Sequence, residues 1–334
     1  MKKSSIHYKD IISIENLLLA WEEFLNGKKN KIDAQEFQLN LFDNIISLYN
    51  SLQTKTYTHA GYKAFNISDP KPRNIHKAIV RDRLLHHAIY KILYPYFDKL
   101  FIHDSYSCRL DKGTHRAINR FRDFGRKVSK NNTKTCWVLK CDIRKFFASI
   151  NQTILLNILN KHIEDKEIIW LLARVIKSFD SRKESVGLPL GNLTSQLLVN
   201  IYMNEFDSWM KHQMKVKYYI RYADDFVILS TDKYYLLELT YKISEFLEEN
   251  LKLSLHPNKV FIKTLSSGVD FLGWGHFPTH RVLRTATKRR VVKALNENEN
   301  VSSLMSYSGL LKHGNQFVLQ TQINERIKNL LKKD

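Results

Sequence analysis

The sequence predicts an α+β fold, in which helices and short strands alternate along most of the chain and a helical, basic segment follows. Three observations support this. Apolar residues recur at helical spacing in several segments, short runs rich in β-branched and aromatic residues lie between them, and residues 281–334 return to a helical pattern. Such an order is typical of an α+β core with a helical appendage. With only 11 Gly and 6 Pro and no repeat or low-complexity linker, we expect one compact body.

The first third of the chain is expected to be mainly helical. Apolar positions at helical spacing in residues 11–55 predict helices with a polar break at residues 26–30. Residues 60–110 mix short extended pieces with a helix around Arg83–Phe97.

The middle of the chain alternates strands and helices. Residues 136–142 are short and largely apolar, and they predict a buried strand that ends in Asp142. Helices are expected in residues 152–180 and 193–215, separated by a Gly- and Pro-containing loop at residues 186–191. Two strand-like runs predict a hairpin over residues 217–230.

The last third begins with an amphipathic helix over residues 234–250, and two more strands are expected within residues 258–275. From residue 281 onward the pattern is helical and basic, with 11 Lys and Arg against 4 Asp and Glu, a net charge of +7.

The whole chain carries a large excess of positive charge. Its 53 Lys and Arg against 33 Asp and Glu give a formal net charge of +20. Such an excess favours a polyanionic partner, usually nucleic acid. The alternative is a basic protein kept soluble by self-repulsion.

The cysteines and the N-terminal segment indicate the cellular compartment in which the protein is expected. Cys108, Cys136 and Cys141 form no Cys-x-x-Cys pair, so they predict neither a disulfide framework nor a zinc site, and a reducing cytosol fits best. No apolar signal core follows the basic start, and the apolar stretch at residues 16–21 is too short to span a membrane. We therefore expect a cytoplasmic protein.

Two adjacent acids, Asp224 and Asp225, interrupt an apolar, strand-like run. Because Asp is depleted in strands and favoured in turns, both acids are expected at the tip of the hairpin. A lone Asp-Asp pair is more often a simple turn than a metal site. A second strand-end acid, Asp142, lies 82 residues before Asp224 and changes that interpretation.

Two strand-end carboxylate sites suit a pair of divalent ions. Mg²⁺ prefers hard oxygen ligands and often combines carboxylates with substrate phosphates. Two such ions roughly 3.5–4 Å apart stabilise the attacking and leaving oxygens of an in-line phosphoryl displacement. The sequence therefore predicts a phosphoryl-transfer site with two Mg²⁺ ions, for which Mn²⁺ could substitute.

These residues resemble the reverse transcriptase family. Tyr222-Ala223-Asp224-Asp225 is similar to the family's Tyr-x-Asp-Asp box, and the segment from Asp142 to Phe147 is similar to its first palm motif. The resemblance implies RNA-directed DNA synthesis, with Asp142, Asp224 and Asp225 as the catalytic carboxylates and the Ile143 carbonyl as a further metal ligand. It also implies Phe147 as a steric gate that collides with a ribose 2′-OH and so selects dNTP over rNTP. Alternatively, Phe146 and Phe147 could both be core residues, and at least one of them is expected to be.

The resemblance further implies a right-hand polymerase. Its N-terminal helices and fingers would occupy residues 1–130, and its palm, an antiparallel sheet plus helices, residues 131–280. Some fingers elements would lie around residues 155–190, and residues 281–334 would form a helical, basic thumb.

Further site residues are carried over by the same resemblance. Residues expected to bind the dNTP, besides Phe147, are Arg73, Arg81, Leu190, Gly191 and Lys259. Residues expected to contact template or primer are Arg109, Lys112, Gln196, Gly273, Trp274, Lys288, Arg289 and Arg290. A salt bridge of Arg81 with Asp82 is an equally open role for that arginine, and Trp274 could pack or stack on a sugar.

One stretch points to a subfamily. Most reverse transcriptases carry Gln-Gly-x-x-x-Ser-Pro where this chain has Leu190-Gly191-x-x-x-Ser195-Gln196. The Leu and Gln variants resemble the reverse transcriptases of diversity-generating retroelements, within the group II intron- and retron-like bacterial superfamily. Two further segments strengthen that resemblance: Ser107-Cys108-Arg109 with Lys112-Gly113-Thr114-His115, and Ser306-Tyr307-Ser308-Gly309 with Lys312-His313.

That resemblance implies cDNA synthesis from a template RNA with errors concentrated at adenines, and a small, basic, oligomeric accessory protein as partner. Leu190 offers a physical reason, because a hydrocarbon side chain cannot hydrogen-bond to the nucleotide or template. Correct and incorrect pairs would then differ less in transition-state binding. Alternatively, Leu190 only fills an apolar gap.

Three rival functions stay open. The nearest is another bacterial reverse transcriptase, of the retron or antiphage-defence type, which Leu190 and Gln196 disfavour. A catalytically idle RNA-binding scaffold is disfavoured by the intact set of acids, and an RNA-dependent RNA polymerase is disfavoured by Phe147.

Overall fold

The computed structural model describes residues 4–68, 72–181, 183–297 and 300–332. The chain divides into two compact units, and each unit is assembled from three separate segments. Unit 1 comprises Met1–Cys108, Ile143–Lys215 and Ile243–Pro257, and unit 2 comprises Arg109–Asp142, Val216–Lys242 and Asn258–Asp334.

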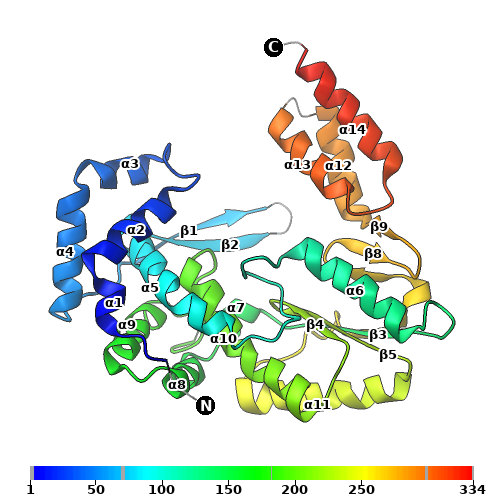
Figure 1. Ribbon diagram of the computed structural model, residues 1–334, viewed down its shortest axis with the longest axis horizontal. Helices are drawn as coiled ribbons and strands as arrows, with labels where there is room; N and C mark the ends of the chain where they lie inside the picture. Colours follow the sequence, from blue (N-terminus) through cyan, green and yellow to red (C-terminus); the bar gives the residue numbers. More distant parts are fainter. Residues whose placement is uncertain (1–3, 69–71, 182, 298–299, 333–334) are drawn as a thin grey trace. The chain divides into compact units, whose positions relative to one another are not determined.

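Unit 1 is mainly helical, as the apolar spacing of its segments predicts. Its elements are α1 (Tyr8–Ile12), α2 (Ile14–Leu25), α3 (Ile32–Leu39), α4 (Leu41–Gln53), β1 (Tyr62–Ile67), β2 (Arg73–Ala78), α5 (Val80–Asp98), α7 (Phe146–Ser149), α8 (Gln152–His162), α9 (Lys166–Ile176), α10 (Leu193–Ser208) and the π-helical turn η1 (Trp209–Gln213). Helix α5 packs against both α2 and α10 (Figure 1). Its buried apolar side chains, among them Leu84, Leu85 and Ile89, form the centre of this unit.

Side-chain caps begin several of these helices, including α2, where Ser13 Oγ accepts from the backbone N–H of Asn16. Asn151 accepts a hydrogen bond from the backbone N–H of Ile154 at the start of α8, and Asp165 accepts from Glu167 and Ile168 at the start of α9. Such caps satisfy backbone donors that have no partner within the helix. The strands β1 and β2 pair as an antiparallel hairpin from Tyr62↔Ala78 to Ile67↔Arg73.

Unit 2 is built on a four-stranded antiparallel sheet in the order β4-β5-β3-β6. Its strands are β3 (Trp137–Asp142), β4 (Tyr219–Tyr222), β5 (Asp225–Ser230) and β6 (Phe261–Thr264), and helix α6 (Thr114–Val128) packs on β4 and β5 (Figure 1). The apolar face of α6 buries Ile118, Phe121 and Phe124. Helix α11 (Lys233–Leu251) begins in unit 2 and continues into unit 1.

The rest of unit 2 consists of a small sheet and three helices. Strands β7 (Val269–Phe271), β8 (Trp274–His276) and β9 (Arg281–Leu283) form a meander, followed by α12 (Thr285–Glu297), α13 (Val301–Leu311) and α14 (Phe317–Leu330) (Figure 1). Trp274, Val291, Leu304 and Ile323 belong to the apolar core that these helices share.

The mixed helix-and-strand class is confirmed, and three local expectations are corrected. Residues 258–275 hold β6, β7 and the first residues of β8 rather than two strands. The segment after residue 281 opens with β9 before it becomes helical, and the helix expected over residues 193–215 ends in a π-helical turn. No helix in the described ranges has the length and apolar character required to cross a bilayer.

Candidate active site

The sheet of unit 2 brings the predicted acids together. Asp142, the last residue of β3, stands directly opposite Asp225, the first residue of β5. On the other side, Asp225 is paired with Tyr222 of β4. Asp224 lies between Tyr222 and Asp225, in the two-residue turn that joins β4 to β5.

The register places the side chains of Asp142 and Asp225 on one face of the sheet. Directly opposed residues of an antiparallel pair have Cα atoms about 4.5–5.5 Å apart and side chains on the same side. Both carboxylates are partly shielded, with exposed side-chain fractions of 15% for Asp142 and 20% for Asp225. Asp142 and Asp225, which the sequence separates by 83 residues, are therefore neighbours in unit 2.

Two lysines neutralise these carboxylates. Lys259 Nζ lies 2.9 Å from Asp142 Oδ1, and Lys140 Nζ lies 3.4 Å from Asp225 Oδ2. Lys140 is opposite Val227 and thus diagonal to Asp225, a spacing that a long side chain can bridge. Our sequence reasoning missed Lys140, although its position two residues before Asp142 puts it on the same face of the strand.

Asp225 is held where a negative charge is costly. Burial, together with the nearby charges of Asp224 and Asp142, raises the pKa of Asp225 to about 7, against the lowering effect of Lys140. Its Oδ1 atom is buried and has no hydrogen-bond partner in the part of the chain that the structure describes. An unpartnered buried carboxylate oxygen is costly unless a cation or a donor reaches it.

The donor set fits a divalent cation, although the side chains are not arranged as a finished cage. Carboxylate oxygens on one face of a strand pair, one of them without a partner, are the hard ligands that Mg²⁺ prefers. Within the described ranges, however, no three His, Cys, Asp or Glu side chains are grouped closely enough to hold one ion as they stand. Binding would require Lys259 to leave Asp142, whose Oδ1 it contacts at 2.9 Å.

Contacts from Arg221, which the sequence did not single out, and from Thr114 hold the turn that carries Asp224. Ala223 has a φ of 55°, a left-handed conformation that is uncommon for a residue with a Cβ. Arg221 is fully buried, and its Nη1 donates to the Ala223 carbonyl at 3.2 Å. Thr114 Oγ1 donates to the Tyr222 hydroxyl at 3.2 Å. A buried arginine that binds the turn carbonyl can maintain a backbone conformation that would otherwise be unfavourable.

In unit 1 a loop brings together part of the predicted nucleotide site. The carbonyl of Leu190 accepts from the backbone N–H of His76 on β2 at 3.0 Å, and Asn192 Nδ2 donates to the His76 carbonyl at 2.9 Å. The backbone N–H of Leu188 donates to the Phe147 carbonyl at 2.8 Å. The loop is therefore fixed to β2 on one side and to the segment of Phe147 on the other.

Gly191 is required by the geometry of this loop. Its φ is +109°, and a Cβ at this position would come within 2.7 Å of Ile75 Cγ2 on β2. Both the backbone angle and the close approach favour glycine. The Leu190 side chain is partly exposed beside it.

The two phenylalanines of the first palm motif have different environments. Phe146 is buried, whereas Phe147 is half-buried with its ring 5.6 Å from that of Phe146 at an angle of 75°. Only Phe146 is a full core residue. Ile143, the expected carbonyl ligand, is buried and pairs with Leu255 in a single antiparallel bridge.

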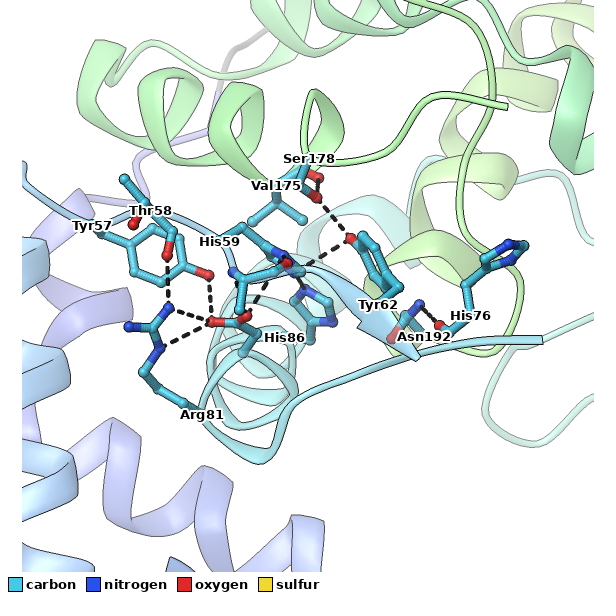
Figure 2. A network of polar contacts seen from close by, with 12 residues as sticks. Tyr57, Thr58, His59, Tyr62, His76, Arg81, His86, Val175, Ser178 and Asn192 are labelled. Carbon is cyan, nitrogen blue, oxygen red and sulfur yellow. Dashed lines mark hydrogen bonds and ion pairs between the residues drawn. The ribbon is translucent and has the colours of Figure 1, made fainter. Parts of the chain in front are cut away.

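The two arginines expected to bind the dNTP from the fingers also differ in their exposure and contacts. Arg73 is exposed at the first position of β2, opposite Ile67. Arg81 is engaged, because its Nε donates to Asp82 Oδ1 at 3.1 Å and its Nη2 donates to the Thr58 carbonyl at 2.6 Å. Figure 2 shows the Arg81 side chain in a network of polar contacts with Tyr57 and His59. The salt bridge considered from the sequence is the arrangement observed for Arg81.

The residues expected to contact template or primer are spread over several elements. Arg109 and Lys112 are partly exposed in the segment before α6, and Gln196 is partly exposed on α10. Gly273, with a φ of +85°, accepts at its carbonyl from the backbone N–H of Arg284 at 3.1 Å. Three more residues of this set lie on α12. Lys288 and Arg289 are exposed, and Arg290 is partly exposed.

Trp274 does not lie where it could stack on a sugar. Its side chain is only 1% exposed and lies in the core shared with α12–α14. Of the two roles that the sequence left open, the structure shows packing, because a buried indole offers no face to a sugar.

An antiparallel sheet with two opposed aspartates and a third in the adjoining turn defines a class of site suited to metal-assisted phosphoryl transfer. A family model described as "Reverse transcriptase (RNA-dependent DNA polymerase)" matches residues 68–276. The chain belongs to this family and is an RNA-directed DNA polymerase by class.

Relatives and a solved structure agree with this assignment. Protein YkfC of Escherichia coli K12 is 26% identical over 284 residues, which are 73% of this chain and 72% of YkfC. The group II intron-encoded protein LtrA of Lactococcus lactis is 23% identical over 313 residues, which are 72% of this chain but 50% of LtrA. The structure of apo telomerase from Candida tropicalis, truncated from the C-terminal domain, is similar with a TM-score of 0.50 at 14% identity. The match covers 73% of this chain and 60% of that one and shows the fold alone.

Proposed function

We propose that this reverse transcriptase adds dNTPs to a primer 3′ end on an RNA template, with Asp142, Asp224 and Asp225 holding two Mg²⁺ ions and the Ile143 carbonyl as a further ligand. The observation that carries the proposal is the pairing of Asp142 with Asp225 on one sheet face, next to the turn of Asp224. When bound, two divalent ions stabilise the attacking 3′ oxygen and the leaving pyrophosphate oxygen.

The chain's own residues prepare this site. The lysines hold the carboxylates in place before the substrate arrives, since Lys140 and Lys259 each lie within 3.4 Å of a carboxylate oxygen. Once Lys259 is released from Asp142, its ammonium group is free to bind triphosphate oxygens. Arg221 keeps the Ala223–Asp224 turn in its left-handed conformation. The half-buried ring of Phe147 serves as the gate against a ribose 2′-OH.

The same proposal assigns the fingers, palm and thumb to segments of the chain. Residues 1–130 would form the N-terminal helices and fingers, with further fingers elements around residues 155–190. Residues 131–280 would form the palm, and residues 281–334 a basic thumb. The support is the predominance of helices in the first segment, the acidic sheet in the second and the exposed cations of α12 in the third.

Primer extension tests the metal site. Each of Asp142→Asn, Asp224→Asn and Asp225→Asn is expected to lower kcat by at least about 10³-fold, because each removes a charge that the transition state needs. Asp43→Asn, a matched change at an exposed acid on α4, should leave activity intact. Binding of template–primer, measured separately, shows whether the variants are folded. Full activity of Asp142→Asn would exclude that residue from the site.

Sugar selection gives a second readout. Replacing Phe147 by Ala is expected to raise the efficiency of rNTP use relative to dNTP, because the space for a 2′-OH is opened. Equal discrimination by the variant and the wild type would rule out the gate and reopen an RNA polymerase assignment.

We further propose that the enzyme makes adenine-mutagenic cDNA in a diversity-generating retroelement and works with a small, basic, oligomeric accessory protein. The support is the Leu190 and Gln196 pattern, together with the fixed position of the Leu190 loop against β2. A rigid loop that presents a hydrocarbon gives the nascent pair no polar contact at that point.

Sequencing of cDNA made on a defined template tests this finer role. Wild-type cDNA is expected to show errors concentrated opposite template adenines, and Leu190→Gln should reduce them several-fold. Repeating the assay with the neighbouring gene products tests the accessory protein. Uniformly low errors in every condition would favour the alternative, another bacterial reverse transcriptase of the retron or antiphage-defence type, which the similarity to LtrA and YkfC supports equally.

A further inference from the structure

A small basic cavity lies in unit 2, and no residue that lines it belongs to the acidic site. Its volume is about 220 Å³, and it is enclosed by α6, the connection between β8 and β9, and the residues that follow α13. Three permanent cations line it, Arg122, Arg281 and Lys312, and no carboxylate does. A cavity with this lining has a positive potential and selects an anion.

Arg281 is the fixed cation of this cavity. Its Nη2 donates to Asn119 Oδ1 at 2.9 Å, and its Nε donates to the His313 carbonyl. Its guanidinium lies over the Trp274 ring, 5.8 Å from the ring centre. The remaining nitrogen, Nη1, is buried without a hydrogen-bond partner among the described residues. Burial and the charge of Arg122 lower the pKa of Arg281, which is the effect of a positive charge that no acid compensates.

Next to Arg281, two segments that the sequence singled out for a subfamily resemblance come into contact. The rings of His115 and His313 stack with centres 3.6 Å apart and an angle of 17°. His115 belongs to the segment before and at the start of α6, and His313 follows α13. The backbone N–H of Asn315 donates to the Arg281 carbonyl at 3.0 Å. These contacts hold the loop with Lys312 in a fixed place beside the guanidinium.

The rest of the lining is apolar and aromatic. Phe121 and Leu265 contribute side chains, and Phe277 stacks on His280 with ring centres 4.8 Å apart. The volume is below the roughly 300–1,000 Å³ of sites for drug-sized ligands. A cavity of this size accommodates one phosphate group with an adjoining sugar, and the apolar wall suits the sugar.

We propose that this cavity binds a backbone phosphate of a nucleic-acid strand at a site separate from the catalytic carboxylates. The proposal rests on the proposed function, which supplies the polyanionic substrate. The planar guanidinium of Arg281, which has Nη1 left to donate, and the flexible ammonium of Lys312 are the two forms of cation that proteins use for phosphate. Arg122 adds a third cation to the lining; its side chain is exposed, and its Nε lies 3.9 Å from Asp123 Oδ1.

Equilibrium binding of labelled oligonucleotides without terminal phosphates tests the proposal. The probes are a single-stranded RNA and an RNA–DNA duplex, measured in EDTA and without dNTP. The double variant Arg122→Ala/Lys312→Ala is expected to bind about tenfold more weakly, and its log–log salt slope should fall by up to roughly 0.7–0.9, the value for one lost phosphate contact. The matched control, Lys293→Ala/Lys328→Ala, removes two exposed cations of the same unit that do not line the cavity.

A second variant distinguishes the effect of the planar Arg281 guanidinium from the effect of its charge. Arg281→Lys keeps the charge but loses the planar fork, so binding should weaken while the salt slope changes little. Its thermal midpoint, measured in parallel, shows whether the loop has lost its anchor. Wild-type affinity in a folded Arg281→Lys protein would overturn the role of the fork.

Free inorganic phosphate has the same chemical group as the backbone phosphate and could bind the cavity in its place. Inorganic phosphate at millimolar concentration is expected to shift the NMR signals of His280 and His313 and to compete with the oligonucleotide. If phosphate binds while the double variant keeps wild-type affinity for both oligonucleotides, the cavity is a small-anion site and the nucleic-acid proposal is overturned. Equal weakening by the control variant would overturn it as well. None of these readouts needs catalysis, so an inactive acidic site leaves them unchanged.

Discussion

The side chain of Asp225 holds a carboxylate where its negative charge is costly. Its pKa is raised from 3.8 to about 7, so between those values the folded state keeps a proton that the unfolded state has released. The free energy of unfolding therefore falls as the pH rises through this window. At 1.36 kcal/mol per pKa unit, the full shift corresponds to at most about 4 kcal/mol.

We predict that Asp225→Asn becomes progressively more stable relative to wild type between pH 4 and pH 7 in EDTA. Urea unfolding at several pH values measures the difference, which should grow by about 2–4 kcal/mol because the amide does not titrate. Asp43→Asn provides the control, with no change of the difference over this range. Adding Mg²⁺ above pH 7 should reduce the gap by stabilising the ionised wild type. A difference independent of pH would show that burial does not penalise this carboxylate.

At this scale the sequence predicted the acids but not their partners. Asp142, Asp224 and Asp225 stand out because carboxylates are unusual beside apolar strands. The diagonal contact of Lys140 depends on strand register, which the sequence alone does not give. The buried Arg221 likewise reads as an ordinary charge between Ile220 and Tyr222 until the turn is seen.

Among the elements, the β1–β2 hairpin and helix α5 are tied together by the network of Figure 2. Its centre is Asp82, which is fully buried and accepts from the Tyr57 hydroxyl at 3.0 Å, the Ala60 N–H at 2.8 Å and Arg81 Nε at 3.1 Å. Beyond it, His59 Nε2 lies 3.2 Å from His86 Nε2 on α5. Burial lowers the pKa of both histidines, so both are neutral near pH 7.

We predict that Asp82→Asn lowers the free energy of unfolding by about 2–4 kcal/mol, because the charge of Arg81 then lacks its partner in a shielded position. Tyr57→Phe removes one hydrogen bond and leaves both charges, so it should cost only about 1 kcal/mol. Denaturant unfolding of the two variants at pH 7 checks the order. Equal losses would mean that the ion pair adds nothing beyond its hydrogen bonds.

The elements themselves were predictable where they are long. The amphipathic helix at residues 234–250 and the hairpin at residues 217–230 match α11 and β4–β5 closely. The meander β7–β9 was missed as such, because each of its strands has three residues and shows too little alternation to be recognised. The close fit of Gly191 against Ile75 was also invisible, since β2 and the loop are far apart in the sequence.

For the molecule as a whole, the sequence could not show how the chain divides. Each unit takes three segments of the chain, so no cut along the sequence separates them. Composition nevertheless carries information at this scale, because net charge does not depend on the path of the chain. The formal charge of +20 and the net +7 after residue 281 predict a strong electrostatic contribution to nucleic-acid binding.

We predict that the affinity for an RNA–DNA duplex falls steeply with salt, with a log–log slope of about −4 or steeper between 50 and 300 mM KCl. Contacts with five or more phosphates would produce such a slope, because each releases condensed counterions. Lys288→Ala/Arg289→Ala should reduce the slope by up to about 2, and to the same extent for unrelated sequences, since backbone contacts carry no sequence information. The control Lys29→Ala/Lys99→Ala removes two exposed cations of unit 1 and should change the slope by less than about 0.5. A slope near zero in the wild type would instead favour the reading in which the surplus charge only keeps the protein soluble.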